Sequence, residues 1–329
     1  MLNFRYFALA LASLCLAPTF QLRAAALNED FSNNPAARGW RAVGQTNLFS
    51  WNPTNQNLEV TWDSSQSNSF YCLPLGTVLA ATDDFSLAFD LRLDDCLAGA
   101  NPAKPYSFEL AIGLLNLAQA SGPTFLRGAG SGLPNLFEFD YFPDDGSGFS
   151  SLDATMSDLS GNMQFYYANT PLSTGDNYRV SLNYSASNKT VTAWMSRSNE
   201  VYCLLTNSFS SSSFGDFRLD HLAICSYSDQ GQDPLYGGSI LAHGVVDNFA
   251  VNLPQPPVTI ITGNLGPGGT WLVTCGSQTN WLYNLERTTD LQSWSPASPA
   301  LSGNGTALQL QDTNAPWLGA FYRVRAVRP

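Results

Sequence analysis

The sequence predicts an all-β protein made of antiparallel β-sandwiches, and three observations predict it. Gly, Pro, Asn and Ser interrupt the chain about every ten residues, as in proteins built from many short strands. The segments between these breaks alternate between apolar and polar residues, which is the period of a strand with one buried face. No long stretch has the apolar spacing of a helix.

The first residues have the composition of a secretion signal. Arg5 supplies a positive charge, and an apolar stretch too short to span a bilayer follows it. Small residues at Ala24 and Ala26 predict cleavage after Ala26. We therefore expect residues 1–26 to be a signal peptide and the protein to be secreted, extracellular or periplasmic. The alternative is an uncleaved membrane anchor.

A Pro-rich break divides the remaining chain into two predicted domains. Residues 254–257 have the composition of a short stiff linker. The large domain before it spans 27–253. The small domain after it spans 258–329 and offers about five strands, a number that suits an immunoglobulin- or fibronectin-like sandwich. It would serve to attach the protein to a cell envelope, or only to stabilise the chain.

The charge of the chain excludes several classes of partner. The formal net charge is −11, and it becomes −13 once Arg5 and Arg23 leave with the signal. Nucleic acids and anionic lipids are recognised by basic patches, which this sequence lacks. We expect no nucleic-acid partner and no membrane insertion, and neutral ligands or cations fit better.

The cysteines leave two alternatives open. Cys15 leaves with the signal, so five cysteines remain. An exported protein can form disulfides, and the neighbours along the chain would pair as Cys72–Cys96 and Cys203–Cys225, with Cys275 left over. The alternative is five reduced and buried thiols. Their spacing is unlike that of a zinc site.

The strand faces give the candidate ligand-binding residues. Each alternating segment has one apolar face for the core and one polar face. If several of these strands are neighbours in one sheet, their polar faces form a single surface. Trp194 points away from the core in this pattern, and a tryptophan on a polar surface can stack on a sugar ring; the alternative is that a loop or the other domain covers it. The predicted surface comprises Asp90, Arg92, Glu109, Glu138, Asp140, Arg179, Asn183 and Trp194.

The large domain resembles the concanavalin A-like lectin/glucanase jelly roll. The opening "LNEDF…GW" (27–40), the strand "EFDYF" and the closing "GVVDNFAV" (244–251) carry the resemblance. With the tail motifs "WLYNLERTTDLQSW" and "LQDTNAPWLGAFYRVRAV", the chain also resembles secreted proteins of environmental bacteria. The resemblance implies a jelly-roll sandwich with a glycan on its concave polar face.

Glycoside hydrolases of this superfamily suggest one role for the E-x-D strand. There Glu138 would be the nucleophile, Asp140 would tune it, and a second Glu would follow two or three residues later. Phe142 and Pro143 occupy those positions. Because retaining hydrolysis needs two carboxyl groups, the motif favours a protein that is not an enzyme, unless Glu109 replaces the missing acid.

Legume-type lectins suggest a metal site on the same strand. Glu138, Asp140, the Phe142 carbonyl and Asp144 match the first part of their ligand pattern, but Phe149 stands where a later Asp is expected. Oxygen ligands would suit Ca²⁺, and an ordinary turn is the alternative. A second calcium candidate lies at Asp247, near the closing strand, where capping of backbone N–H groups is the alternative.

These observations predict a secreted, non-catalytic carbohydrate-binding protein that requires no cofactor, with Ca²⁺ as a candidate ion. One alternative is a polysaccharide-cleaving glycoside hydrolase using Glu138. Another is a structural or adhesive protein of the cell surface.

Overall fold

A computed structural model describes residues 25–127, 133–144, 148–208, 214–231, 238–316 and 319–329. Most of the predicted signal therefore lies outside the described residues. The first strand, β1 (Ala25–Glu29), begins at Ala25, so cleavage after Ala26 would remove its first two residues. No helix in the described ranges is long and apolar enough to cross a membrane.

The first part of the chain folds into two antiparallel sheets, which confirms the predicted all-β sandwich. Sheet A has the order β13-β12-β11-β6-β15-β4-β3, with β1 paired to β15. Its strands are β3 (Phe49–Asn52), β4 (Asn57–Asp63), β6 (Phe85–Ala98), β11 (Asn177–Ser185), β12 (Thr190–Arg197), β13 (Glu200–Ser208) and β15 (Ile240–Leu253).

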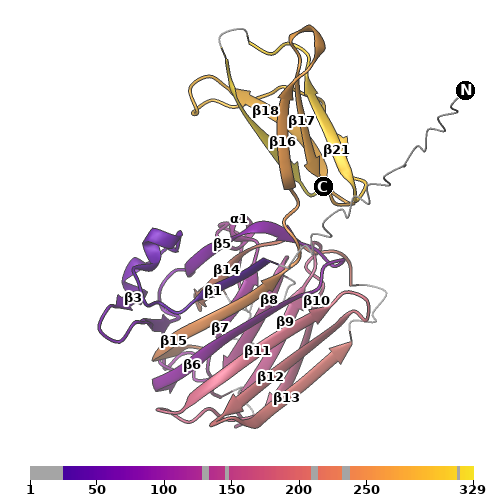
Figure 1. The fold of residues 1–329 in the computed structure, drawn as a ribbon. Coiled ribbons are helices and arrows are strands. Elements are labelled where there is room, and N and C mark those ends of the chain that lie inside the picture. Colours follow the sequence, from indigo (N-terminus) through magenta and orange to yellow (C-terminus); the bar gives the residue numbers. More distant parts are fainter. Residues whose placement is uncertain (1–24, 128–132, 145–147, 209–213, 232–237, 317–318) are drawn as a thin grey trace, which may run out of the picture.

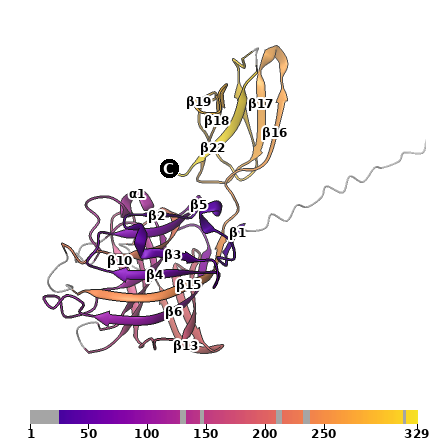
Figure 2. The ribbon, with the colours of Figure 1, turned by 90° about the vertical axis from the view of Figure 1, so that its left-hand side faces the viewer.

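Sheet B forms the second layer, with the order β10-β9-β8-β7-β14-β5-β2 (Figures 1 and 2). Its strands are β2 (Arg41–Val43), β5 (Ser69–Leu79), β7 (Leu110–Leu115), β8 (Leu136–Phe142), β9 (Ser151–Ser157), β10 (Met163–Asn169) and β14 (Leu219–Ser226). The short helical elements of this part are η1 (Pro35–Arg38), η2 (Thr46–Leu48) and α1 (Leu117–Ala120).

Aromatic side chains join the two layers. The Phe85 and Phe137 rings meet edge to face at 5.1 Å, and the Phe89 and Phe139 rings meet at 5.8 Å. These four residues occupy the odd positions of β6 and β8, as the alternating pattern predicts. Their even-numbered neighbours therefore point away from the core, and on the two sheets they point in opposite directions.

The strands after residue 258 form a separate body above the sandwich (Figures 1 and 2). One of its sheets contains β16 (Thr259–Leu265), β17 (Trp271–Gly276) and β21 (Ala307–Asp312), and η3 (Pro267–Gly269) lies between the first two. The other contains β18 (Leu282–Thr288), β19 (Ser295–Pro296), β20 (Leu301–Ser302) and β22 (Phe321–Val327). This body has its own small core around Tyr283. Its immunoglobulin-like character stays a prediction.

The five cysteines that the structure describes are free thiols. Cys72 lies on β5 of sheet B and Cys96 on β6 of sheet A; Cys203 lies on β13 of sheet A and Cys225 on β14 of sheet B. The predicted pairs Cys72–Cys96 and Cys203–Cys225 are wrong, because all four of these thiols are free. The alternative of reduced thiols describes this chain, with Cys72, Cys225 and Cys275 buried.

Candidate functional site

The predicted ligand-binding residues do not share one surface. Asp90, Arg92, Arg179, Asn183 and Trp194 lie on β6, β11 and β12 of sheet A. Glu138 and Asp140 lie on β8 of sheet B, and Glu109 directly precedes β7. Since the apolar faces of the sheets pack together, the polar faces look outward on opposite sides of the sandwich. The prediction of a single surface is wrong because alternation assigns a face within each strand but does not assign the strand to a sheet.

The outer face of sheet A carries ordinary surface charges. Arg179 lies 3.1 Å from Asp90, and the Asn248 side chain donates to Asp90 at 2.8 Å. Arg92 pairs with Asp94 at 2.7 Å. All these ion pairs are partly exposed to solvent, so each contributes about 0–1 kcal/mol of stability.

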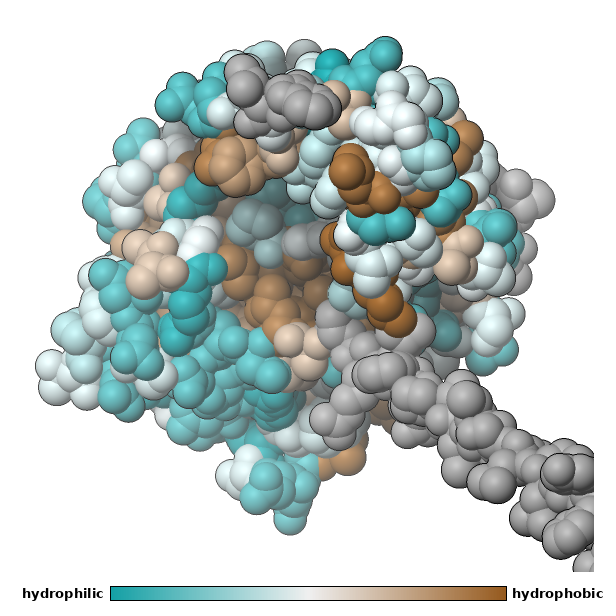
Figure 3. All heavy atoms as spheres, turned by 45° about the horizontal axis from the view of Figure 1, so that its top comes forward, coloured by the Kyte–Doolittle hydropathy of each residue, from teal (hydrophilic) through white to brown (hydrophobic). Residues whose placement is uncertain are grey.

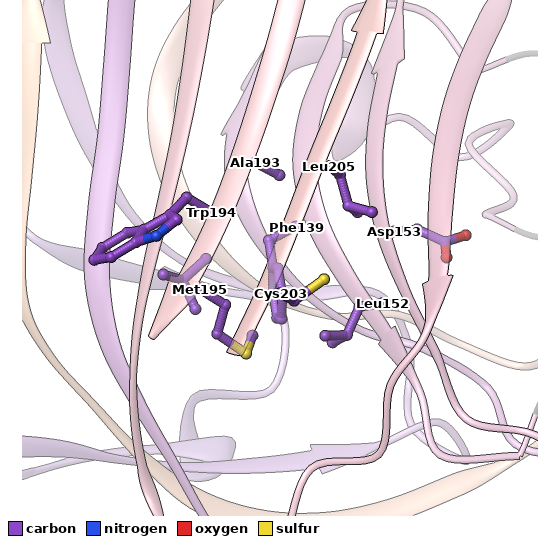
Figure 4. Close-up of a pocket in the computed structure, with 9 residues that line it drawn as sticks. Phe139, Leu152, Asp153, Ala193, Trp194, Met195, Cys203 and Leu205 are labelled. Atoms are coloured by element: carbon purple, nitrogen blue, oxygen red, sulfur yellow. The ribbon is translucent and has the colours of Figure 1, made fainter. Parts of the chain in front are cut away.

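Trp194 lies on this outer face of sheet A, apart from the carboxylates of β8. In the close-up its ring extends away from Phe139 and Met195, while Asp153 lies on the other side of the view (Figure 4). The cavity between the sheets at this point has a volume of about 10 Å³. A cavity of that size holds at most one water molecule, so it is not a ligand site.

The carboxylates of β8 fit because their cross-strand neighbours are small. Glu138 is registered with Gly113, and Asp140 with Ala111. A Cβ atom at Gly113 would lie 2.8 Å from Glu138 Cγ and 2.7 Å from Glu138 Cα, which is closer than such contacts tolerate. The Phe137 carbonyl oxygen would lie still closer, so only glycine at position 113 leaves room for both the backbone of β8 and the Glu138 side chain.

Arg127 joins the three carboxyl groups on the outer face of sheet B. Its Nε lies 2.9 Å from Glu109 Oε1 and 3.4 Å from Glu138 Oε2, and its Nη2 donates to Asp140 Oδ2 at 3.0 Å. The Arg127 side chain is 7% exposed and the carboxylates at most 1%. One cation thus faces three acids in a water-poor site, which we call the carboxylate cluster (Glu109, Arg127, Glu138 and Asp140).

Tyr227 covers the carboxylate cluster. Its hydroxyl donates a short hydrogen bond to Glu138 Oε1. Its ring packs between Phe70 and Phe125, with centroids 6.0 Å and 5.8 Å away, and the Arg127 guanidinium lies 5.9 Å from the ring. Sequence reasoning missed both Arg127 and Tyr227, since neither lies in one of the alternating segments from which the candidate residues were taken.

Burial changes the protonation of the cluster. It raises the pKa of Glu138 to about 7, raises that of Glu109 well above its usual value, and also raises that of Asp140. Burial disfavours the ionised form, and neighbouring carboxylates oppose one another's ionisation, while Arg127 counteracts both effects only in part. Glu138 Oε2 and Asp140 Oδ1 have no hydrogen-bond partner among the described residues. Glu138 therefore stays partly protonated near neutral pH.

The predicted metal ligands Asp144 and Asp247 take part in local hydrogen bonds. The Asp144 carbonyl accepts hydrogen bonds from Ser107 N and Oγ at 2.9 Å and 2.7 Å. Asp247 Oδ1 accepts from the backbone N–H of Asn248 at 2.7 Å, and burial raises the Asp247 pKa to about 6. In the part of the chain that the structure describes, no three His, Cys, Asp or Glu side chains are grouped so that they could hold a metal ion. Calcium binding stays a prediction.

Two exposed aromatic residues lie next to the cluster. On β10, Phe165 is registered with Thr155, and Tyr167 is registered with Asp153. These β9 residues are in turn registered with Glu138 and Asp140, so all six side chains lie on the outer face of sheet B. Phe165 is 52% exposed and Tyr167 56% exposed. Tyr166, between them, is 46% exposed, but it is registered with buried Ala154 and points to the other face.

Comparisons with known proteins found structural similarity to lectins and lyases at low sequence identity. No protein-family model matches the sequence, and no curated protein matches it. The legume lectin-like domain from Entamoeba histolytica is similar in structure at 10% identity, with a TM-score of 0.43 over 69% of this chain and 96% of that one. The marine alginate lyase from Aplysia kurodai is similar at 10% identity, with a TM-score of 0.43 over 70% of this chain and 99% of that one. An alginate lyase variant in complex with alginate tetrasaccharide is similar at 13% identity, with a TM-score of 0.42 over 71% of this chain and 98% of that one.

Proposed function

We propose that the protein is a secreted, non-catalytic carbohydrate-binding protein that holds a glycan on the outer face of sheet B, over β9 and β10. The observation that supports this most is the pair of exposed rings, Phe165 and Tyr167, in consecutive same-face positions. Apolar rings gain by packing against the CH groups of a sugar, and the Tyr167 hydroxyl can bond a sugar hydroxyl.

The sealed carboxylate cluster supports binding without catalysis. A retaining hydrolase needs two carboxyl groups on either side of the scissile bond. Here Arg127 Nε contacts both Glu109 and Glu138, so a guanidinium occupies the position between them. Tyr227, whose ring packs against Phe125, donates a hydrogen bond to Glu138. Glu138 therefore serves the structure of the face and does not reach a glycosidic bond.

The cluster also contributes to the proposed site by holding the neighbouring strands of sheet B in a fixed geometry. Charged groups that are buried and joined across β7, β8 and the Arg127 segment hold these elements in one geometry. The adjacent β9 and β10 then present Phe165 and Tyr167 from a rigid sheet. A rigid platform loses little conformational entropy when a ligand binds.

A glycan array followed by isothermal titration tests this proposal. We expect Tyr167→Ala to weaken binding of the selected glycan by about tenfold, which corresponds to roughly 1.4 kcal/mol. Tyr166→Ala is the matched control, because it removes the adjacent ring on the opposite face and should leave affinity within about twofold. Failure to bind any glycan, or equal effects of the two substitutions, would refute the proposal. Release of reducing ends from the glycan would favour the hydrolase instead.

A further inference from the structure

A second hollow lies where the two bodies of the protein meet. Its volume is about 590 Å³, which is within the usual range for pockets that bind small ligands. Thr82 and Asp83 of the large sandwich and Gln255 of the connecting segment line one side. Residues of β16, β17 and β21 line the other. With the top of Figure 1 turned 45° toward the viewer, the surface of the protein shows a hollow that has apolar residues at its bottom and polar residues beside it (Figure 3). The residues that line the 590 Å³ hollow are mostly polar.

An ion pair fixes the two sides of this junction. Arg328 Nη1 lies 2.7 Å from Asp83 Oδ2, and Nη2 lies 3.1 Å from Asp83 Oδ1. The guanidinium also lies 4.8 Å from the centroid of the Trp281 ring. Such a bidentate pair has a fixed geometry, and the Arg328 side chain is 5% exposed. The hollow is thus bordered by a charge pair whose net charge is zero.

One buried donor of this pair is left unused. Arg328 Nε has no hydrogen-bond partner among the described residues, although it is shielded from solvent. A buried N–H without an acceptor costs about 1–3 kcal/mol. Arg328 lines the hollow and carries this unused donor.

The rest of the lining is rich in hydroxyl and amide groups. They come from the start of β16, the end of β17, the loop that follows it, and the turn before β21. The residues are Thr259, Thr262, Thr274, Ser277, Gln278 and Thr306. Groups of this kind both donate and accept hydrogen bonds, and none of them carries a charge. Ser277 Oγ already donates to the Thr306 carbonyl at 2.8 Å, and Gln278 Nε2 donates to the Gln255 carbonyl at 2.7 Å.

Ile260 supplies an apolar side chain in an unusual backbone conformation. Its φ is 48°, and the register of β16 against β17 shifts between Thr259 and Thr262. A β-branched residue with positive φ is a conformational outlier, and such strain is concentrated at binding sites. The bulge leaves Ile260 65% exposed at the hollow.

We propose that this hollow is a second binding site, and that it takes a neutral oligosaccharide. Hydroxyl and amide groups match the hydroxyl groups of a sugar, and the exposed Ile260 side chain would pack against its CH face. An anionic sugar finds no uncompensated cation here, because Asp83 neutralises Arg328. An extended peptide would need apolar pockets for its alternate side chains, whereas the lining offers mainly hydroxyls and glycines.

The experiment uses the full chain carrying both Phe165→Ala and Tyr167→Ala, which we call the background. In this double variant the proposed site on sheet B no longer contributes to sugar binding. Cellohexaose, laminarihexaose, mannohexaose and xylohexaose are the probes, observed by saturation-transfer NMR and isothermal titration. We expect at least one hexasaccharide to bind this background at a single site. Thr274→Arg should weaken that binding by about tenfold or more. Gln309→Arg is the matched control, because Gln309 is the cross-strand partner of Thr274 on the same face but lies outside the lining.

A second variant separates binding from folding. Ile260→Gly removes the apolar side chain and the strain of the positive φ. It should therefore raise the melting temperature of the protein while lowering the affinity for the hexasaccharide about fivefold. A purely structural Ile260 would leave affinity unchanged. The proposal is overturned if no hexasaccharide binds the background, if Thr274→Arg acts no more strongly than Gln309→Arg, or if only a Ser/Gly peptide binds. Loss of all binding in the background, with binding intact in the parent protein, would overturn this inference and leave the site on sheet B standing.

Discussion

Arg127 Nη2 lies 3.0 Å from Asp140 Oδ2, and both side chains are buried on the outer face of sheet B. The same guanidinium also contacts Glu109 and Glu138. A face that would otherwise present three carboxylates to solvent is therefore closed by one cation.

Replacing Arg127 should strongly destabilise the protein. Arg127→Met leaves three buried carboxyl groups without a cation, and breaking a buried ion pair in this way costs roughly 3–5 kcal/mol. The free energy of unfolding, measured in urea at pH 7, should fall by that amount. Arg179→Met is the matched control, because the Arg179–Asp90 pair is partly exposed and its loss should cost less than about 1 kcal/mol. Equal losses in the two variants would contradict the burial of the cluster.

The stability of the protein should depend on pH through Glu138. Burial raises its pKa to about 7 in the folded state, so the folded protein binds more protons than the unfolded chain above the ordinary pKa of Glu. The free energy of unfolding contributed by this group is therefore complete below about pH 4.5 and is lost as the pH rises through 7, by roughly 3 kcal/mol in all.

Glu138→Gln measures this contribution as a difference. The amide does not titrate, so between pH 4.5 and 8 the stability of the variant should decline less than that of the parent. Carboxyl groups with a lowered pKa make the protein more stable as the pH rises. Asp290 is one of them, because hydrogen bonds lower its pKa to about 2. The effects of such groups cancel when the two proteins are compared by urea denaturation at each pH. Parallel stability profiles would show that Glu138 is ionised in the folded state.

Gly113 should be the least replaceable glycine near the cluster. Gly113→Ala places a methyl group 2.8 Å from Glu138 Cγ and against the backbone of β8. Overpacking of this kind costs about 1–3 kcal/mol, and more where backbone must move. Gly215→Ala is the control, because its Cβ would meet only the Asp158 carboxylate, at 3.3 Å. Thermal unfolding should separate the two variants by several degrees.

The sequence predicted which segments are strands and which residues face the core, but it did not predict which strands pair with one another. In β6, β11 and β12 the alternation correctly identified the residues of the core face, because that face of a strand must be apolar. In β8 it identified the core face but not the burial of Glu138 and Asp140 on the other face. Trp194 and Glu138 nevertheless lie on opposite sides of the sandwich, since the pairing of distant strands leaves no local pattern. Arg127 shows the same limit. It comes from an irregular segment, and only the folded chain brings it to Glu138.

Reducing agents should leave the stability of the protein unchanged. The five described cysteines are free, so dithiothreitol has no disulfide to break among them. Burial raises the pKa of Cys72 and Cys225, which keeps both as unreactive thiols in the native state. Mass spectrometry after alkylation should show these two residues unmodified in buffer and modified in urea. A melting temperature that falls with dithiothreitol would indicate a disulfide.

Trp194 and Tyr167 provide the comparison that decides which side of the sandwich holds a glycan. Trp194 lies on sheet A, beside exposed Leu204 of β13, and Tyr167 lies on sheet B beside Asp153. The two rings face opposite directions, so no single glycan chain stacks on both. If the glycan lies on sheet B, Trp194→Ala should leave its affinity within about twofold, whereas Tyr167→Ala should lower it about tenfold. Isothermal titration of the same glycan against both variants makes the measurement. The reverse order of effects would move the site to sheet A, where the surface ion pair of Asp90 and Arg179 would border it.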